Sequence, residues 1–351
     1  MPGPSQRVVL GGVFGVTLVA AVIRLAWDEP VATFLACGLA LAGLAWVVGI
    51  GTEALGARLG PAATGVLQST LGNLPELFIV LFALGAGETV VARTSILGSL
   101  FANALLVLGL SIVAGATASE DGVMRFHRRL PNDTTTLLVL ALSIIVLLGL
   151  SDRVGDRASA HQVTISAIGA VLLLSVYATW LWSYLRAQGA EPALDISAPN
   201  LSLRVAFGVL GLAGVAAAFV SDWFVHALDP AVDALGISKP FTGIVIVGIA
   251  GNAVENVVGI TLAARGHADL AVSVVKNSVA QIAVFLFPAV VLLSLLFAHR
   301  LTFVLDPVAI GALALTALAV WQITSDGEAT VFEGWALVAL YGVIAVLAWY
   351  E

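Results

Sequence analysis

Long apolar stretches alternate with short polar ones along the whole chain, and glycine, proline and charged residues separate them. A helix needs about 20 residues to cross a hydrocarbon core of about 30 Å, and eleven stretches are close to this length. They cover residues 8–27, 31–51, 62–85, 91–116, 134–151, 163–186, 204–225, 240–264, 271–298, 302–323 and 333–350. Because the stretches are continuous and do not alternate at every second position, they predict transmembrane helices and not the strands of a membrane barrel.

The composition excludes a water-soluble globular protein. Of the 351 residues, 60% are hydrophobic and 11% are charged, whereas a soluble domain carries about a quarter charged residues. The single cysteine, Cys37, excludes a disulfide framework within the chain and most cysteine-based metal sites. We therefore expect an all-α polytopic membrane protein with about 11 transmembrane helices.

The first stretch and the basic residues predict how the chain is inserted. Residues 1–30 form an extra N-terminal transmembrane helix, and no small-residue cleavage site follows it, so we expect it to be retained. Eight Lys or Arg residues fall on the side of the N-terminus and five on the other side, which favours a cytoplasmic N-terminus. Compact loops and a lysine-poor composition favour a bacterial inner (plasma) membrane, with an organelle membrane as the alternative.

Two segments of the chain repeat one another. The first is Gly72-Asn73-Leu74-Pro75-Glu76 and the second is Gly251-Asn252-Ala253-Val254-Glu255, at an offset of 179 residues (255 minus 76). The same offset continues without a gap through the pairs Gly87 and Gly266, Ala92 and Ala271, Ser99 and Ser278, and Ala104 and Ala283. Both motifs lie inside apolar stretches and precede a matching second stretch, which indicates an internal repeat.

The number of intervening helices predicts the orientation of the repeat. Glu76 lies in the third stretch and Glu255 in the eighth, so the two copies enter the membrane from opposite sides. Inverted repeats of this kind are typical of secondary transporters, which bind substrates near the membrane midplane at the repeat interface. The predicted organisation is the N-terminal helix, a first inverted repeat of five helices (31–186), a loop (187–203) and a second inverted repeat of five helices (204–351).

Glu76 and Glu255 are the chemically informative residues. An ionisable side chain at the centre of the bilayer costs about 2.5–3.5 kcal/mol on insertion scales and usually faces a cavity. Two carboxylates brought together by the repeat would supply two negative charges to one hard cation such as Ca²⁺. Protons would compete with the cation for the same oxygens, which is the basis of an exchange mechanism. The alternative is that each glutamate is a buried, hydrogen-bonded structural acid.

Other polar and helix-breaking residues complete the predicted site. Neutral oxygens come from Asn73, Asn252, Ser99, Asn103, Ser278 and Gln281, each of which could instead join helices by hydrogen bonding. Breaks that free backbone carbonyls as ligands are expected at Ser69, Gly72, Pro75, Gly248 and Gly251. Glu53 and Lys276 are candidate modulators, Glu53 beside an entry path or at a solvated helix end.

The sequence resembles the cation/proton exchanger (CAX) branch of the Ca²⁺/cation antiporter superfamily from about residue 51 to residue 296. The residues that carry the resemblance are Gly51-Thr52-Glu53-Ala54-Leu55, Gly60-Pro61, Ser69 to Leu77, Leu235-Gly236-Ile237-Ser238, Phe241-Thr242-Gly243, Gly248 to Glu255, Ser278 and Gln281-Ile282-Ala283. The resemblance implies eleven helices and the exchange of Ca²⁺ for H⁺. It also implies that Glu76 and Glu255 bind the cation and take up protons, with Asn73, Asn252, Ser99, Ser278 and Gln281 as the matching polar positions.

The chain departs from the family pattern at three places. Asn256 follows Glu255 where a histidine is common, which removes a titratable group beside the site. Lys276 precedes Ser278, where it would repel a divalent cation or act as a counter-charge if it points inward, and would be neutral if it snorkels to an interface. The loop 187–203 holds few of the acidic residues that many members carry there.

The sequence therefore predicts a secondary active antiporter that exchanges Ca²⁺ or a related cation for H⁺ by alternating access. The alternatives are an antiporter that handles Na⁺, K⁺ or Mn²⁺, and a scaffold-like member that has lost transport. An intramembrane enzyme is not expected, because the chain has no GxGD aspartate pair and no HExxH motif. Beyond Ca²⁺ and protons as substrates and lipid as surroundings, we expect no cofactor and no nucleic-acid partner, and the sequence does not predict an oligomeric state.

Overall fold

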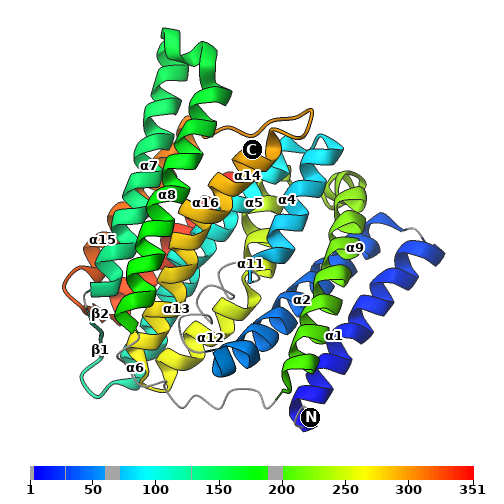
Figure 1. Ribbon diagram of the computed structural model, residues 1–351, viewed down its shortest axis with the longest axis horizontal. Helices are drawn as coiled ribbons and strands as arrows, with labels where there is room; N and C mark the ends of the chain where they lie inside the picture. Colours follow the sequence, from blue (N-terminus) through cyan, green and yellow to red (C-terminus); the bar gives the residue numbers. More distant parts are fainter. Residues whose placement is uncertain (1–3, 28, 60–71, 128, 189–200) are drawn as a thin grey trace.

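A computed structural model describes residues 4–27, 29–59, 72–127, 129–188 and 201–351, and these are almost entirely helical (Figure 1). The helices are α1 (Pro4–Val22), α2 (Pro30–Leu59), α4 (Leu74–Ala86), α5 (Thr89–Phe101), α6 (Leu108–Ala118), α7 (Arg129–Val154), α8 (Gln162–Gln188), α9 (Leu203–Leu235), α10 (Lys239–Phe241), α11 (Gly248–Gly251), α12 (Ala253–Ala264), α13 (Ala268–Gln281), α14 (Phe287–Ser294), α15 (Pro307–Thr324) and α16 (Val331–Tyr350). Four π-helical segments, η1 (Ile23–Trp27), η2 (Ala102–Val107), η4 (Thr242–Val247) and η5 (Ile282–Leu286), and one 3₁₀ segment, η3 (Arg157–His161), join them. Two short strands, β1 (Val123–Arg125) and β2 (Glu328–Thr330), pair antiparallel.

The helices confirm the predicted membrane fold class. Nine helices within the described ranges are long and apolar enough to cross a membrane, and a tenth span consists of Lys239–Gly251 and Glu255–Ala264 with a bend of 59° between them. Of the third predicted stretch the structure describes only α4 and the turn before it, because residues 60–71 lie outside the described residues. The count of eleven therefore stays a prediction.

Four predicted helix boundaries lie five or more residues from the observed ones. Helix α2 ends at Leu59 and not at residue 51, and helix α7 begins at Arg129 and not at residue 134. The other two are the end of α9 and the start of α15. Helix α9 continues to Leu235 and does not stop at residue 225. The polar residues Asp222 and His226 lie one turn apart inside it, with the His226 ring 2.8 Å from the Asp222 carbonyl oxygen. Helix α15 begins at Pro307 and not at residue 302, because the Asp306 side chain caps it by accepting the backbone N–H of Ala309 at 2.8 Å.

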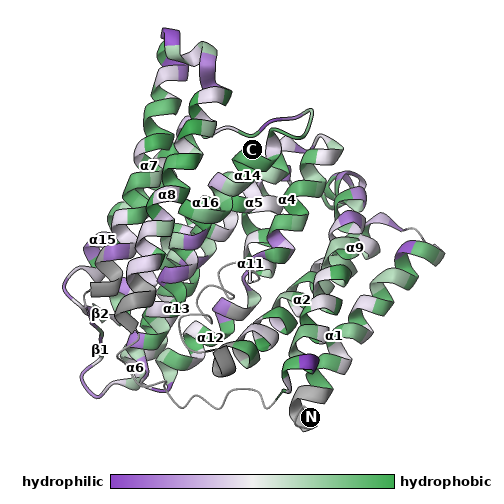
Figure 2. Ribbon diagram, viewed as in Figure 1, coloured by the Kyte–Doolittle hydropathy of each residue, from purple (hydrophilic) through white to green (hydrophobic). Residues whose placement is uncertain are grey.

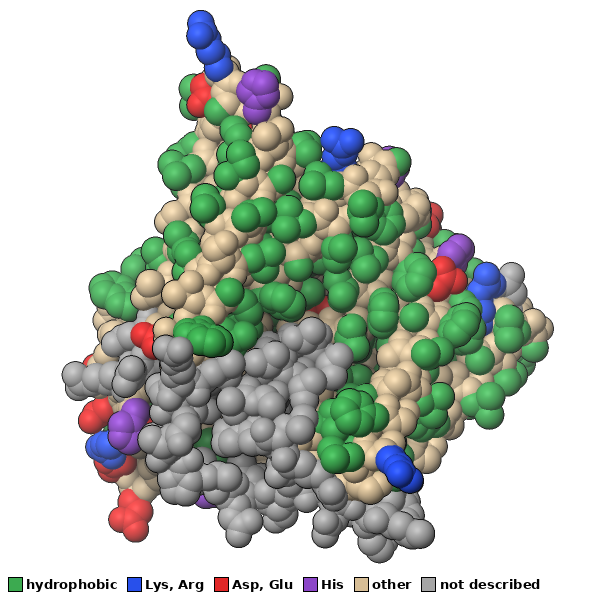
Figure 3. All heavy atoms as spheres, in the orientation of Figure 1, with side chains coloured by type: hydrophobic (Ala, Val, Ile, Leu, Met, Phe, Trp, Pro, Cys, Tyr) green, Lys and Arg blue, Asp and Glu red, His purple; other side chains and the backbone are tan. Residues whose placement is uncertain are grey.

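The exterior is apolar around the middle of the molecule. Figure 3 shows hydrophobic side chains spread over the centre of the visible face, with charged side chains and histidines near its ends. Polar residues likewise gather at the tip of the α7–α8 hairpin, whose length is mostly apolar (Figure 2). Exposed Leu147 and Leu172 on these two helices are 67% and 58% accessible, a pattern that fits a lipid-facing surface and not a water-facing one.

Helices α2 and α9 pack along one another and border the broken helices. The rings of Phe34 on α2 and Phe224 on α9 stack at a centroid distance of 4.6 Å. Gly51 on α2 lies so close to Leu210 on α9 that an added Cβ would be 2.6 Å from the leucine Cγ. Small residues such as glycine at helix contacts let helices approach closely in membranes.

The repeat in the sequence corresponds to a repeat in local structure. Helices α4 and α12 both begin directly after an asparagine, Asn73 or Asn252. The turns that follow these helices contain Gly87 and Gly266, with φ of 86° and 81°, a conformation that favours glycine. Helices α5 and α13 then run into the π-helical segments η2 and η5. All these features occur at the offset of 179 residues that relates the motifs; the outer boundaries of the repeats, 31–186 and 204–351, stay a prediction.

Glycines let the two copies cross backbone to backbone. A Cβ added to Gly98 on α5 would lie 2.5 Å from the carbonyl oxygen of Gly243 and from the Cα of Ile244, both on η4. A Cβ added to Gly248 on α11 would lie 2.5 Å from the carbonyl carbon of Gly98. Because backbone atoms cannot move aside as a flexible side chain can, this crossing needs glycine on both helices.

We expect Gly98→Ala to destabilise the protein by about 1–3 kcal/mol, the usual cost of overpacking. The measurement is the thermal unfolding midpoint in detergent. Gly211→Ala on α9 is the matched control, since nothing lies within 4 Å of its added Cβ and alanine favours a helix over glycine by up to about 1 kcal/mol. Equal midpoints for the two variants would contradict the close crossing.

Candidate functional site

Each copy of the repeat places a glutamate in the first turn of a helix that starts at a break. Glu76 is the third residue of α4 and Glu255 the third residue of α12. The preceding asparagines, Asn73 and Asn252, have φ and ψ of −90° and 12°, and −102° and 25°. The carboxylates therefore lie at the positive ends of helix dipoles, which favour negative charge. Both side chains are buried, with accessibilities of 2% for Glu76 and 8% for Glu255.

Groups from both copies surround the carboxyl group of Glu76. Its Oε1 accepts a hydrogen bond from the hydroxyl of Ser99 on α5, and a second from Nδ2 of Asn252 at 2.7 Å. Gly251 approaches the same side chain so closely that an added Cβ would be 2.6 Å from Oε1. The break of the second copy thus lies directly against the glutamate of the first, and a larger residue at position 251 would displace the Glu76 carboxyl group.

Two asparagines extend this network across the repeat. Nδ2 of Asn252 also donates to the carbonyl oxygen of Gly248 at 2.8 Å, and its Oδ1 accepts a hydrogen bond from Nδ2 of Asn103 on η2. Asn103 donates in addition to the carbonyl oxygen of Ser99 at 3.1 Å. Neither Asn73 nor Asn252 uses its side chain to cap the helix that it precedes, which leaves the Asn252 amide for this network.

Two residues of the network, and Ser278 on α13, each have a buried oxygen that is free to accept a further contact in the described part of the chain. Within the described part of the chain, Oε2 of Glu76, Oδ1 of Asn103 and Oγ of Ser278 have no hydrogen-bond partner. Buried polar atoms in proteins are nearly always satisfied, and open carboxylate, amide and hydroxyl oxygens are the ligands that hard cations prefer.

Two of the other predicted residues lie at the first break. Gly72 belongs to the turn before α4, and Pro75 is the second residue of that helix, where a proline is tolerated. Gln281 ends α13 next to η5. Ser69 and the side chain of Glu53 lie outside the described residues, as does most of the loop 187–203.

Lys276 is buried inside the protein and does not reach a membrane–water interface. It is 2% accessible, and its Nζ donates to Oγ1 of Thr324 on α15 at 2.7 Å and to Oγ1 of Thr135 on α7 at 3.3 Å. The side chain therefore connects α13 to α7 and α15 and does not snorkel. These contacts lie on different helices from those that carry the network around Glu76.

Asn256, which replaces the common histidine, spans the second break. Its Nδ2 donates to the carbonyl oxygen of Ile249 on α11 at 3.1 Å. The bond joins α12 to the helix segment on the other side of Asn252. A residue without a titratable group thus fixes the geometry of the break.

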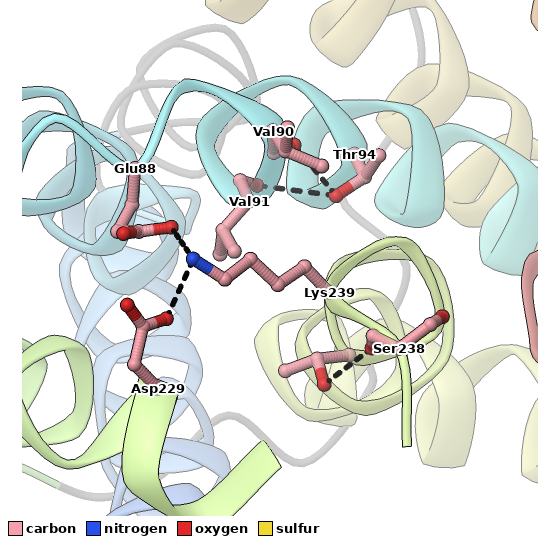
Figure 4. A network of polar contacts seen from close by, with 8 residues as sticks. Glu88, Val90, Val91, Thr94, Asp229, Ser238 and Lys239 are labelled. Atoms are coloured by element: carbon pink, nitrogen blue, oxygen red, sulfur yellow. Dashed lines mark hydrogen bonds and ion pairs between the residues drawn. The ribbon is translucent and has the colours of Figure 1, made fainter. Parts of the chain in front are cut away.

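Sequence analysis missed a second polar cluster. Lys239 Nζ lies 2.7 Å from Oε2 of Glu88 and 2.7 Å from Oδ1 of Asp229, as Figure 4 shows. These residues come from three separate elements, and Glu88 lies 151 residues from Lys239 in the sequence, so no local motif could have revealed the cluster.

A match to a known protein family identifies the class of protein to which the chain belongs. The model described as "Sodium/calcium exchanger protein" matches residues 29–185 and 205–350. The chain belongs to this family. Each matched segment contains one of the two motif glutamates, Glu76 or Glu255, with the helix break before it, and together the segments span most of the chain.

Relatives within the family are similar over nearly their full length. The chain is 31% identical to a Ca²⁺/H⁺ antiporter of Synechocystis sp. over 344 residues, which cover 92% of this chain and 91% of the relative. It is 30% identical to the Ca²⁺/H⁺ antiporter ChaA of Bacillus subtilis over 327 residues, with coverage of 91% and 92%. The chain is thus a CAX member of the Ca²⁺/cation antiporter superfamily.

Solved structures share the fold. The native YfkE structure superposes with a TM-score of 0.81 at 26% identity and covers 98% of this chain and 99% of the other. An H⁺/Ca²⁺ exchanger CAX superposes with a TM-score of 0.75 at 16% identity, covering 98% and 92%, a likeness in fold alone. The helical arrangement of this CAX member is therefore that of membrane transporters.

Proposed function

We propose that this CAX member is a secondary antiporter that exchanges Ca²⁺ for H⁺ across its membrane. The observation that carries the proposal is the network at Glu76, in which side chains of both repeat copies meet on one buried carboxyl group. A purely structural acid would have both oxygens satisfied, whereas Oε2 of Glu76 has no partner among the described residues. The names of the similar antiporters support the same pair of substrates.

In the proposed site, Glu76 and Glu255 neutralise one divalent cation near the membrane midplane. Among the described residues no three His, Cys, Asp or Glu side chains form a metal-binding cluster, so the remaining ligands would be neutral oxygens. Asn103 and Ser278 offer such oxygens. A protonated carboxyl group is neutral and loses its attraction for the cation, so protons and Ca²⁺ would occupy the two glutamates alternately.

Exchange follows when the occupied site opens to one side of the membrane at a time. Two ionised glutamates without a cation would leave two negative charges buried, and this state is costly in a poorly solvated interior. Bound Ca²⁺ or protons remove that cost and so permit the change of access. We place the protein in a bacterial inner membrane with a cytoplasmic N-terminus, in keeping with the eight basic residues against five.

Flux into vesicles tests the coupling. We expect uptake of radiolabelled Ca²⁺ into proteoliposomes when the interior is acidic relative to the medium, and no stimulation by an outward Na⁺ gradient at equal pH. Empty liposomes and a protonophore are the controls. Uptake driven by Na⁺ and indifferent to the pH gradient would instead support a sodium-coupled exchanger, the second candidate, which the description of the family favours.

A further inference from the structure

Three charged residues join three helical elements at one end of the protein. Lys239 is the first residue of the helix that runs to the break at Asn252. Its ammonium group lies 2.7 Å from a carboxylate oxygen of Glu88 and 2.7 Å from one of Asp229. Figure 4 shows both carboxylates directed at the amine, Glu88 from above and Asp229 from below in this view. We call this cluster the Lys239 triad.

Two residues of the Lys239 triad, Glu88 and Lys239, lie at the far ends of helices that contain or contact Glu76. Glu88 ends the α4–α5 turn, and α4 carries Glu76 in its first turn. The helix that begins at Lys239 ends at Gly251, which touches Glu76. At 1.5 Å per residue, both helices place the triad about 20 Å from the breaks.

Asp229 connects this end to a third helix, α9. Pro230 follows it inside the helix, where proline removes one backbone hydrogen bond and commonly bends a helix. The end of α9 is thus a natural place for bending. Lys239 holds this end against the ends of the two helices that lead to the glutamates.

The position of Lys239 is unfavourable for its own helix, which indicates that its contacts with other helices stabilise it there. A cation at the first residue of a helix opposes the helix dipole, which disfavours positive charge there. The cost is offset by two charge-assisted hydrogen bonds. The side chains of Lys239 and Glu88 are 35% and 19% accessible, so water screens their interaction less than that of a fully exposed pair.

We propose that the Lys239 triad is a latch that holds this end of the protein closed over the glutamates. It breaks when ions enter or leave from this end. The inference rests on the proposed alternating access and adds the contact that governs one of its two gates. The latch joins the first repeat, through Glu88, to the second, through Lys239 and Asp229.

Distance measurements between spin labels test the latch. Labels on cysteines at Val90 and Ala234, both exposed, in a Cys37→Ala background, report the separation of the α4–α5 turn from the end of α9. With Lys239 intact we expect one narrow distance distribution. Lys239→Met should make the longer-distance population on the order of ten times larger than in the unmutated protein, because it removes the partly shielded ion pair with Glu88 and the more exposed one with Asp229. An unchanged distribution would overturn the proposal.

Two further variants separate the latch from a general loss of charge. Lys239→Arg retains both ion pairs and should keep the narrow distribution. The double variant Asp229→Lys with Lys239→Asp moves the ammonium group to α9, where it faces the new carboxylate and Glu88. This variant should restore the narrow distance distribution. Failure of both would contradict the latch. Stabilisation by Ca²⁺ in a thermal assay is read separately: its absence in the unmutated protein would refute the proposed function without altering the distances.

Discussion

Glu76→Gln and Glu255→Gln should each lower Ca²⁺ uptake by about a hundredfold or more, because each removes one of the two charges that would balance the cation. Removing one member of a buried charge pair costs about 3–5 kcal/mol, and each 1.4 kcal/mol is about tenfold in affinity. Glutamine keeps the shape of the side chain, and its oxygen still accepts hydrogen bonds from Ser99 and Asn252 at position 76. Uptake in proteoliposomes under an imposed pH gradient is the measurement.

A thermal assay shows whether these losses arise from binding. Ca²⁺ at about 100 times its dissociation constant stabilises a protein by about 2.7 kcal/mol, and we expect this gain to vanish in both glutamate variants. Glu120→Gln is the matched control, since Glu120 is exposed in the loop after α6. Stabilisation by Ca²⁺ that survived in both glutamate variants would exclude them as its ligands.

Acidification should raise the apparent KM for Ca²⁺ on the side where the cation binds. Carboxylate ligands must be deprotonated to bind a metal, so affinity falls as pH falls. If one proton is displaced, KM rises roughly tenfold per pH unit in the range where the carboxyl groups are protonated, and roughly a hundredfold if two are displaced. Initial rates over a matrix of pH and Ca²⁺ concentration measure this slope.

The form of the inhibition distinguishes shared oxygens from a separate proton site. Competition for the same two carboxyl groups predicts that saturating Ca²⁺ restores the full rate at low pH. A maximal rate that fell with pH while KM stayed constant would contradict shared binding. Glu120→Gln should leave the slope unchanged.

Residue types and their spacing were enough to predict the membrane fold and the pair of candidate acids. Continuous apolar stretches can only be helices in lipid, because every backbone amide must be paired within its own segment. The offset of 179 residues identified the second motif before any coordinates, and the structure repeats the asparagine break and the positive-φ glycine at that offset. Helix ends such as that of α9 were harder to predict, since Asp222 and His226 resemble a polar terminus in sequence but contact each other within one continuous helix.

Contacts between distant segments were decided only by the tertiary structure. The sequence does not show that Asn252 donates to Glu76, that Gly251 touches its carboxyl group, or that Lys276 lies between two threonines. These contacts depend on how helices cross, and crossing is fixed by side-chain shape at the interface. The local pattern of apolar and polar residues sets which segments become helices in lipid, whereas the packing of those helices against one another selects the groups that meet at the buried carboxyl group of Glu76.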